Sequence, residues 1–347
     1  MVKTGVIGLG RVGKELARQI TARHWDVIFA ADSKNIYRIR ERFTDDELVK
    51  QVAAPLSCGD YPDMIERSKI DILFMATPSN LGQISLYYAY HALKKGVLVV
   101  TCEKAFLSDY FTNIKLWFDL GRIGYSATVG GGTMMLSEIQ KRLNLHSSPP
   151  AIYAVLNGTL NFLFGGGTIA EALKLGLTEP GANDPIAVVN AEIKDTARKA
   201  IIIHNTILNA RQAIDAKDIS ITPVTPPAYY RLTTGGFRYY VIFSSERLPK
   251  IIEGWNNYIC FHKTIGRGSI IGGFFQPGKN EFLQKLVIPG ANNAFAMDSP
   301  HEECREIFPC PAGGPGAGPE PTAAAMIKDA ENLLAEKNWG CLVSYLP

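Results

Sequence analysis

The sequence has little net charge and no long apolar run. Its 36 basic and 33 acidic residues leave a formal net charge of +3, and no basic stripe is interleaved with aromatic residues. A nucleic-acid partner is therefore not expected. No apolar run reaches the ~18 residues that a membrane helix needs, so a membrane partner is not expected either.

Signal peptides and cysteine motifs are also missing. The N-terminal MVKTGVIGLGRVG already looks like part of a folded domain, without a signal-peptide pattern, which predicts a cytoplasmic protein. The six cysteines form no CxxC pair and no cluster with zinc spacing, so most are expected to be buried free thiols. Cys341, close to the C-terminus, is the exception. We predict that it is reachable and oxidises between subunits.

The sequence does have a glycine-rich turn in an informative place. Residues 3–8 form a short apolar strand, and Gly8, Gly10 and Gly13 follow in GxGxxG spacing directly before a helix. The first glycine permits a tight turn, the second lets a pyrophosphate approach the backbone, and the third lets helix and strand pack closely. This strand–turn–helix context predicts a dinucleotide-binding loop.

An acid and several basic residues follow the second strand. Asp32 comes about 20 residues after the glycines, where a carboxylate would hold an adenosine ribose. Lys34, Arg38 and Arg40 come just after it, and they either receive a 2′-phosphate or form a solvated helix face. NAD and NADP both remain open as cofactors. We expect both to bind, NADP the more tightly.

Two further strands end at Thr77-Pro78 and at Glu103-Lys104, with a predicted helix over residues 82–95 between them. Such alternation is typical of parallel βαβ units, in which ligands bind beyond the carboxyl ends of the strands. The four residues at these ends are therefore candidate site residues. Residues 125–135, YSATVGGGTMM, are predicted to form one more strand, which three glycines break.

The pattern then changes. Residues 228–289 contain four short β-type runs, FRYYVIF, NNYICFH, SIIGGFF and FLQKLVI, which predict a second, sheet-containing domain. After a glycine-rich loop, Pro321 leads into a closing helix of about four turns.

One predicted helix, over residues 186–210, carries an acid and an amine among isoleucines. Asp195 and Lys199 are one turn apart and fall on its apolar side. The pair is either a helix-stabilising ion pair worth ~0.5 kcal/mol or a partly buried, functional acid and amine. The expected solvent face of this helix consists of Lys194, Arg198 and Asn205.

Several motifs in order resemble homoserine dehydrogenase. They are GLGRVG, ATPS, VVTCEKAF, SATVGGG, LNGTLNFL, LGLTEP followed by DTARK, and GPGAGPEPTA. The resemblance implies an α/β fold with a Rossmann-type domain over residues 1–135 and 312–347. An inserted α+β catalytic and dimerisation domain would span residues 136–311. It also implies a short form without an ACT domain.

The resemblance further implies an activity. The family interconverts L-homoserine and L-aspartate 4-semialdehyde with NAD(P), on the route to threonine and methionine, and a homodimer is expected. The hydroxyl proton must leave with the hydride, and a lysine accepts it only if its pKa falls towards neutrality. A zwitterionic substrate also needs carboxylates for its amine.

Residue roles follow by matching the motifs. Lys104 and Lys199 match the active-site lysines. Glu179 and Asp195 match the acids that hold the substrate ammonium group, and Gly158 and Thr159 match the turn beside the substrate. The matching cofactor residues are Gly8, Gly10, Arg11, Val12, Gly13, Thr77 and Pro78. Asp32, Lys34 and Gly316 complete the predicted cofactor-binding residues.

Three departures from the family pattern stand out. Ser126 replaces a Glu that helps hold a monovalent cation in some relatives, which leaves the carbonyls of Val129 and Gly131 as predicted cation ligands. The link from Glu179 to Asp195 is longer than usual, with Ile193 in place of a glycine. Glu103 stands directly beside Lys104.

Two alternatives remain open. Another two-domain NAD(P)-dependent dehydrogenase would explain the glycine turn and a strand-end lysine, but not NGTLNFL together with GPGAGPEPTA. A non-catalytic, cofactor-binding regulatory homologue would bind the dinucleotide without turnover.

Overall fold

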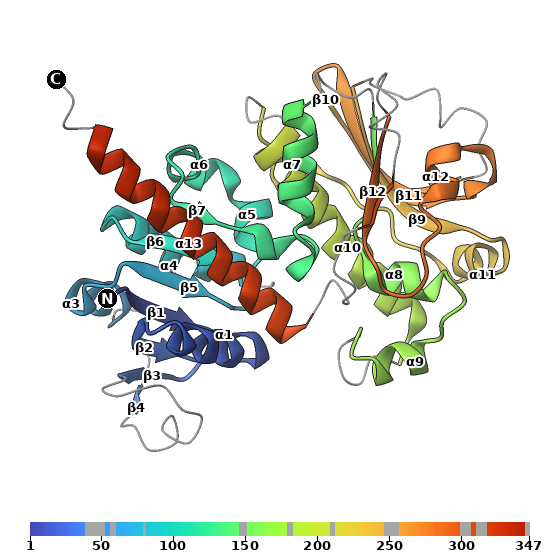
Figure 1. The fold of residues 1–347 in the computed structure, drawn as a ribbon. Coiled ribbons are helices and arrows are strands. Elements are labelled where there is room, and N and C mark those ends of the chain that lie inside the picture. Colours follow the sequence, from blue (N-terminus) through green and yellow to red (C-terminus); the bar gives the residue numbers. More distant parts are fainter. Residues whose placement is uncertain are drawn as a thin grey trace. The chain divides into compact units, whose positions relative to one another are not determined.

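The chain forms two compact units. The computed structural model describes residues 1–38, 53–55, 60–78, 81–145, 151–178, 183–208, 212–245, 257–298, 307–309 and 318–343. The first unit consists of Met1–Gly132 together with Gly318–Pro347, and the second of Thr133–Ala317. The last helix of the chain therefore belongs to the unit that the N-terminus begins (Figure 1).

The first unit contains a seven-stranded sheet in the order β4-β3-β2-β1-β5-β6-β7. The strands β2, β1, β5, β6 and β7 run parallel, and β3 and β4 add to one edge antiparallel. This is the predicted Rossmann-type sheet. The strands are β1 (Lys3–Ile7), β2 (Asp26–Ala31), β3 (Asn35–Arg38), β4 (Ala53–Pro55), β5 (Ile72–Met75), β6 (Leu98–Thr101) and β7 (Ile123–Gly124).

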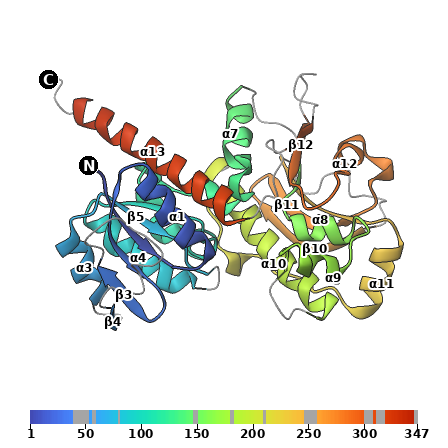
Figure 2. The same cartoon turned by 60° about the horizontal axis from the view of Figure 1, so that its bottom comes forward.

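Helices pack against this sheet through apolar stripes. The helices are α1 (Arg11–Ala22), α3 (Asp60–Ser68), α4 (Gly82–Lys94), α5 (Ala105–Asp109), α6 (Phe111–Asp119) and α13 (Pro319–Val343). In α1, Leu16, Ala17 and Ile20 are buried at helical spacing. They share one core cluster with Met326 and Ile327 of α13, so the two helices lie side by side (Figure 2). None of the helices described is long and apolar enough to span a bilayer.

The closing helix is longer than predicted. Instead of about four turns, α13 has 25 residues, or about seven turns. Among the side chains of α13 that the structure describes, Leu334 is the last that packs on this core. The sequence pattern indicated only this packed portion, because the apolar periodicity that marks a helix fades beyond it.

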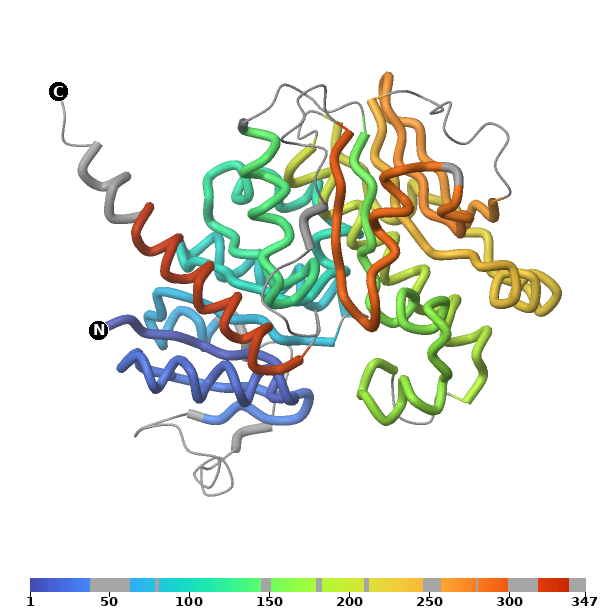
Figure 3. Tube along the Cα trace, turned by 45° about the vertical axis from the view of Figure 1, so that its right-hand side comes forward, coloured from blue at the N-terminus to red at the C-terminus, as the bar shows by residue number. Residues whose placement is uncertain are grey.

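The second unit contains a six-stranded sheet in the order β10-β11-β9-β8-β12-β13, and its neighbouring strands are antiparallel. The strands are β8 (Ala151–Val155), β9 (Arg238–Ser244), β10 (Asn257–Ile265), β11 (Gly268–Phe275), β12 (Ala294–Asp298) and β13 (Ile307–Pro309). The helices are α7 (Met135–Leu145), α8 (Gly158–Leu163), α9 (Ile169–Lys174), α10 (Pro185–Ile203), α11 (Pro226–Thr234) and α12 (Glu281–Lys285). Figure 3 follows the chain through both units.

The sheet prediction for residues 228–289 holds for three of its four runs. FRYYVIF, NNYICFH and SIIGGFF lie in β9, β10 and β11, but FLQKLVI begins with helix α12. Asn280 caps this helix by accepting a hydrogen bond from the Leu283 amide at 2.9 Å. Phe282 then stacks on Tyr153, with ring centroids 5.1 Å apart. The helix therefore covers the sheet instead of extending it.

The predicted strand over residues 125–135 is wrong. This segment forms two 3-10 turns, Ser126–Thr128 and Gly131–Thr133. Gly130, Gly131 and Met134 have φ values of 75°, 56° and 57°, which no strand residue adopts. Gly130 and Gly131 adopt this left-handed backbone at little cost, and the last strand of the sheet ends at Gly124.

The predicted solvent face of the 186–210 helix is wrong at Asn205. After Ile203 the chain continues as a π-helical turn, His204–Leu208, which shifts the positions that follow. Asn205 is fully buried. Its side chain donates to the Ile214 carbonyl at 2.8 Å and accepts from the Ile214 amide at 2.9 Å. The asparagine thus serves as a buried bridge to the next segment.

A buried carboxyl fastens the closing helix to the sheet. Ser126 donates its amide to Asp329 at 2.7 Å and its hydroxyl at 2.6 Å. A side chain at Gly124 would crowd Asp329, which explains the glycine. Burial raises the pKa of Asp329 to about 6, although the hydrogen bonds from Ser126 oppose the shift.

This pKa shift has a definite sign for stability. A carboxyl group whose folded pKa is raised stabilises the fold below its ordinary pKa. That contribution is lost as pH rises through about 6. Relative to Asp329→Asn, which stays uncharged, the wild type should lose about 1–3 kcal/mol between about pH 4 and pH 7. Thermal melts of both proteins across this range measure the difference.

Glu331→Gln is the matched control, because Glu331 lies on the same helix and makes an exposed pair with Arg23 at 3.0 Å. It should leave the pH dependence of the melting temperature unchanged. A gap between wild type and Asp329→Asn that stays constant with pH would contradict the prediction.

Candidate active site

The glycine turn of the first unit has a different constraint at each glycine. Gly8 has φ +89°, and a Cβ there would overlap the Ala76 carbonyl. A Cβ at Gly13 would overlap the carbonyl oxygen of Gly8, so α1 and β1 approach as closely as glycine allows. Gly10 differs, because a Cβ there would meet nothing within 4 Å. The middle of the turn is open, whereas its two ends are tightly packed.

The open glycine lies at the N-terminus of α1. Gly10 is the N-cap residue, no side chain caps this end, and its carbonyl accepts the Lys14 amide at 3.0 Å. Arg11 is exposed and Val12 packs partly on the core. A 12-residue helix with uncapped amides and an open approach suits an anionic group such as a pyrophosphate.

Asp32 is held by the hairpin that follows it. Its Oδ1 accepts the amides of Lys34 and Asn35, both at 2.7 Å, and its Oδ2 accepts the Tyr37 hydroxyl at 2.8 Å. Burial acts to raise the pKa of Asp32, but these hydrogen bonds outweigh it and lower the pKa. The carboxylate is therefore charged and oriented at neutral pH.

The basic residues after Asp32 do not form a helix face. Lys34 is exposed in the turn, and Arg38 lies in β3 opposite Phe29 of β2. Lys34 and Arg38 therefore belong to a hairpin, which the sequence pattern did not indicate. Arg40 lies outside the described residues.

The next two strand ends carry the other predicted groups of this unit. Thr77 follows β5, and its hydroxyl lies 3.0 Å from that of Ser85 in α4. Pro78 is exposed. Lys104 follows β6 at the start of α5, where its carbonyl accepts the Ser108 amide at 2.9 Å. Its side chain is half-buried.

Glu103, the unusual neighbour of Lys104, caps α5. It is fully buried, and its two oxygens accept the amides of Ala105 and Phe106 at 2.7 and 2.8 Å. This acid stabilises the helix start that carries Lys104. The preceding Cys102 is a free thiol whose pKa burial raises to about 11, so it is not a reactive nucleophile.

Among the remaining cysteines, the structure describes the side chain of Cys260 but not that of Cys341. Cys260 is free and buried, as predicted, and burial raises its pKa. The side chain of Cys341 lies outside the described part of α13, so its oxidation stays a prediction.

Asp195 and Lys199 of α10 form a close pair in the second unit. Lys199 Nζ lies 2.8 Å from Asp195 Oδ2, and the two side chains are 12% and 26% exposed. Nζ also donates to the Leu156 carbonyl at 3.0 Å. This second bond attaches the amine to the end of β8, so the pair is not a simple surface ion pair along a helix.

The turn at Gly158 and Thr159 is packed just as closely. A Cβ at Gly158 would overlap the Ala291 carbonyl. Thr159 is nearly buried, and its hydroxyl donates to the Leu177 carbonyl at 2.9 Å. These two residues begin α8, and the Thr159 bond attaches that helix to the segment that leads towards α10.

Two polar residues at this place were missed by the sequence reasoning. Asn157 Nδ2 donates to Glu192 Oε2 at 2.6 Å and lies 3.5 Å from Asp195 Oδ2. Glu192 lies three residues before Asp195, so one turn of helix puts both on one face of α10. That spacing was the available signal. No local pattern indicates Asn157, which follows β8 and caps α8, as the partner.

Some predicted positions are not placed. Glu179 and Gly316 lie outside the described residues. Ile193, which replaces the family glycine, is fully buried, so it packs into the core instead of lining a site.

The predicted cation site loses a candidate ligand at residue 126. Serine has no carboxylate to replace the family's Glu, and the Ser126 amide and hydroxyl both donate to Asp329. No group of three acidic, His or Cys side chains that would suit a metal occurs among the residues described. The cation prediction therefore depends on the Val129 and Gly131 carbonyls alone.

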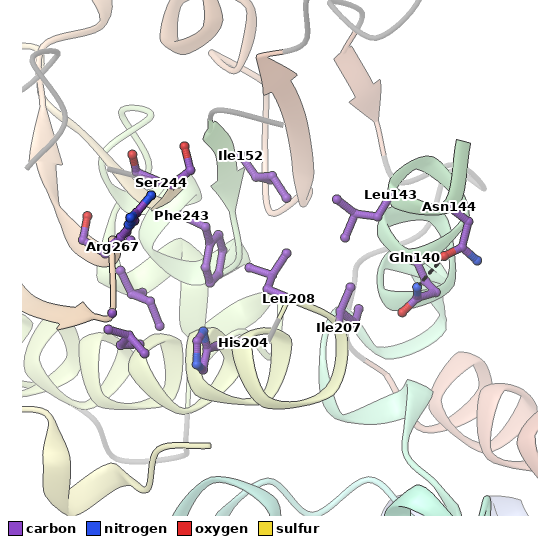
Figure 4. Close-up of a pocket in the computed structure, with 16 residues that line it drawn as sticks. Gln140, Leu143, Asn144, Ile152, His204, Ile207, Leu208, Phe243, Ser244 and Arg267 are labelled. Carbon is purple, nitrogen blue, oxygen red and sulfur yellow. Dashed lines mark hydrogen bonds between the residues drawn. The ribbon is translucent and has the colours of Figure 1, made fainter. Parts of the chain in front are cut away.

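A separate cavity of about 530 Å³ lies beside the π-helical turn that follows α10 (Figure 4). Gln140 and Asn144 of α7, hydrogen-bonded to each other at 2.9 Å, line it together with His204. Burial lowers the pKa of His204, although the Gln212 carbonyl opposes this. Of the described residues that line the cavity, none is a predicted site residue.

No protein-family model matches the chain, but curated relatives do. The chain is 26% identical over 270 residues to bifunctional aspartokinase/homoserine dehydrogenase 1 of Zea mays, covering 70% of this chain and 27% of that protein. It is 31% identical over 178 residues to the homoserine dehydrogenase of Sulfurisphaera tokodaii, covering 46% of this chain and 54% of that protein. The chain thus spans less than two-thirds of these relatives' length.

Solved structures share the whole architecture. A homoserine dehydrogenase from Thermoplasma acidophilum matches with a TM-score of 0.68 at 20% identity, covering 97% of this chain and 99% of that chain. A putative homoserine dehydrogenase from Archaeoglobus fulgidus matches with a TM-score of 0.67 at 22% identity, covering 96% and 99%. A Candida auris protein of unknown function has the same score at 17% identity, covering 96% and 98%.

The fold and the glycine turn define a two-unit α/β protein of the dinucleotide-binding class. The sequence relatives narrow this class, because the chain is related to the homoserine dehydrogenases. The resemblance that the ordered motifs predicted is thereby confirmed.

The glycine geometry generates a stability prediction. Gly13→Ala must displace the Gly8 carbonyl, so it should cost about 2–3 kcal/mol. Gly10→Ala meets open space and should cost less than about 1 kcal/mol. Chemical denaturation of both variants measures the two costs. Equal costs would contradict the packing difference described above.

Proposed function

We propose that this chain is a homoserine dehydrogenase, interconverting L-homoserine and L-aspartate 4-semialdehyde with NAD(P). One observation supports the proposal above the others. The Asp195–Lys199 pair, matched to the family's acid and amine, is attached to the end of β8 directly before the Gly158-Thr159 turn. The ordered motifs of the sequence and the relatedness to homoserine dehydrogenases agree with this assignment.

The first unit is proposed as the dinucleotide-binding domain. Backbone amides at the N-terminus of α1 would hold the pyrophosphate, with Gly10 open beside them. Asp32, fixed by three hydrogen bonds, would accept a ribose hydroxyl. Thr77 and Pro78 would contact the cofactor from the end of β5. When bound, the nicotinamide accepts the hydride that leaves C4 of homoserine.

The second unit is proposed as the substrate, catalytic and dimerisation domain. Asp195, joined by Glu179, would bind the substrate's ammonium group, and Gly158 with Thr159 would line the substrate. Lys199 is held as a donor towards Asp195 and Leu156, an arrangement that suits hydrogen bonding to the substrate oxygen. Taking the hydroxyl proton needs a neutral amine, which either Lys104 or Lys199 would supply in its deprotonated form.

The direct test is NAD(P)⁺ reduction with L-homoserine beside a panel of sugars and amino acids. Turnover on homoserine alone is the expected result. Activity on another alcohol would favour a different two-domain dehydrogenase. Cofactor binding without turnover would favour a non-catalytic homologue.

Lysine substitutions separate a catalytic role from a structural one. Lys199→Met should fold normally and bind NADPH, but its kcat for homoserine oxidation should fall by about 10²-fold or more, the usual scale for a lost proton-transfer group. Lys104→Met should behave the same way. Asp195→Asn should chiefly raise KM for homoserine, because its proposed role is to bind the ammonium group.

Steady-state kinetics, cofactor titration and thermal melts of the three variants check these outcomes. A folded Lys199→Met enzyme with wild-type kcat would show that the Asp195–Lys199 pair has only a structural role.

Cofactor preference is tested by equilibrium binding. We expect the protein to bind both reduced cofactors, NADPH the more tightly, because Lys34 is exposed two residues after Asp32. Lys34→Ala should weaken NADPH binding by about tenfold and leave NADH binding unchanged, since only NADPH carries the 2′-phosphate. Dissociation constants for NADPH and NADH, measured at one salt concentration, test this preference. NADH binding more tightly than NADPH would overturn this preference.

A further inference from the structure

One face of α10 carries a row of three charged side chains. Glu192, Asp195 and Lys199 follow one another at spacings of three and four residues, so they lie within about 60° of one another around the helix axis. The end of β8 meets this row at two points. Asn157 contacts Glu192 and Asp195, and the Leu156 carbonyl contacts Lys199.

The orientation of the Asn157 amide is fixed by the helix that it caps. Its Oδ1 accepts the Leu160 amide at 2.8 Å, and an N–H group can only donate, so Nδ2 must face the two acids. The residue is 3% exposed, which rules out free rotation into solvent. Nδ2 lies 2.6 Å from Glu192 Oε2 and 3.5 Å from Asp195 Oδ2. Both carboxylates therefore converge on one nitrogen.

Two converging carboxylates repel each other unless donors or cations lie between them. The amide of Asn157 and the ammonium of Lys199 are the donors already present in this cluster. A primary ammonium group offers three N–H donors and suits such a pair of acids. The Asp195 side chain is 26% exposed and Glu192 is half-buried, so a small ligand can reach them.

We propose that Asn157 is a positioning residue that holds Glu192 and Asp195 together as the seat of the substrate's ammonium group. Glu192 thereby joins the substrate-binding acids, a role that no motif gave it. The inference rests on the proposed function, because homoserine supplies the ammonium group. Asparagine is required here rather than aspartate, since both cap α8 but only the amide donates towards the acids.

The test compares Asn157→Asp and Glu192→Gln with wild type. Asn157→Asp keeps the acceptor for the Leu160 amide but puts a third carboxylate beside the other two. Glu192→Gln keeps the shape and removes one charge. Both should raise KM for L-homoserine by about tenfold or more, with kcat within about threefold of wild type and an unchanged Kd for NADPH.

Asn190→Asp is the matched control. Asn190 lies on the same helix and also binds backbone through its side chain, donating to the Val224 carbonyl at 3.1 Å and accepting its amide at 2.7 Å. It points about 140° away from Asp195. This variant should lower the melting temperature without raising KM for homoserine.

The outcomes separate the two proposals. A wild type that does not turn over homoserine overturns the proposed function and this inference with it. An active wild type whose Glu192→Gln variant keeps its KM overturns the inference alone, and so does a lowered melting temperature at unchanged KM in both variants. If Asn157→Asp does not fold, the KM of Glu192→Gln decides by itself.

Discussion

The attachment of α10 to the end of β8 is the interaction on which the polar part of the second unit depends. A helix that presents two acids and an amine towards a protein interior would be costly without partners. Here a backbone carbonyl and one amide side chain supply these partners. The same bonds fix the position of α10 along β8. The charged residues and the Gly158-Thr159 turn therefore keep one fixed relation to each other.

Several acids in this protein accept hydrogen bonds from backbone amides and so stabilise local structure. Asp32, Glu103 and Asp329 each use both carboxylate oxygens to accept hydrogen bonds from the start of a turn, a helix or a neighbouring loop. Asp32 and Glu103 lie where parallel strands end, and this is also where ligands bind in such sheets. An acid at a strand end is thus weak evidence for catalysis, since shaping the loop already explains it.

Sequence reasoning found the elements whose signals are local. The glycine turn, the helix after residue 82 and the strand that runs into Asn157-Gly158-Thr159 all depend on neighbouring residues. The pairing of Asp195 with Lys199 was visible for the same reason, because both lie on one helix. The bond between Asn157 and Glu192 joins residues that are far apart in the chain, and no periodicity reports it.

Local signals also failed where the backbone departs from its regular form. Apolar residues in YSATVGGGTMM suggested a strand, but left-handed glycines turn the chain instead. The π-helical turn after Ile203 moved Asn205 from the expected outer face into the core. The apolar pattern of FLQKLVI fits a strand and a helix equally well. Only the Asn280 cap shows that a helix begins here. Short apolar runs carry this ambiguity in general.

The position of α13 in the first unit has a consequence for how the protein is made. This helix supplies part of the core against β1, β2, β5 and β6, yet it is the last described element of the chain. During synthesis the N-terminal sheet therefore leaves the ribosome with one face partly uncovered. The second unit, which is contiguous in sequence, can close on itself first. The N-terminal sheet can complete its core only after α13 has been synthesised. Until then its exposed apolar face is the place where a chaperone would be needed.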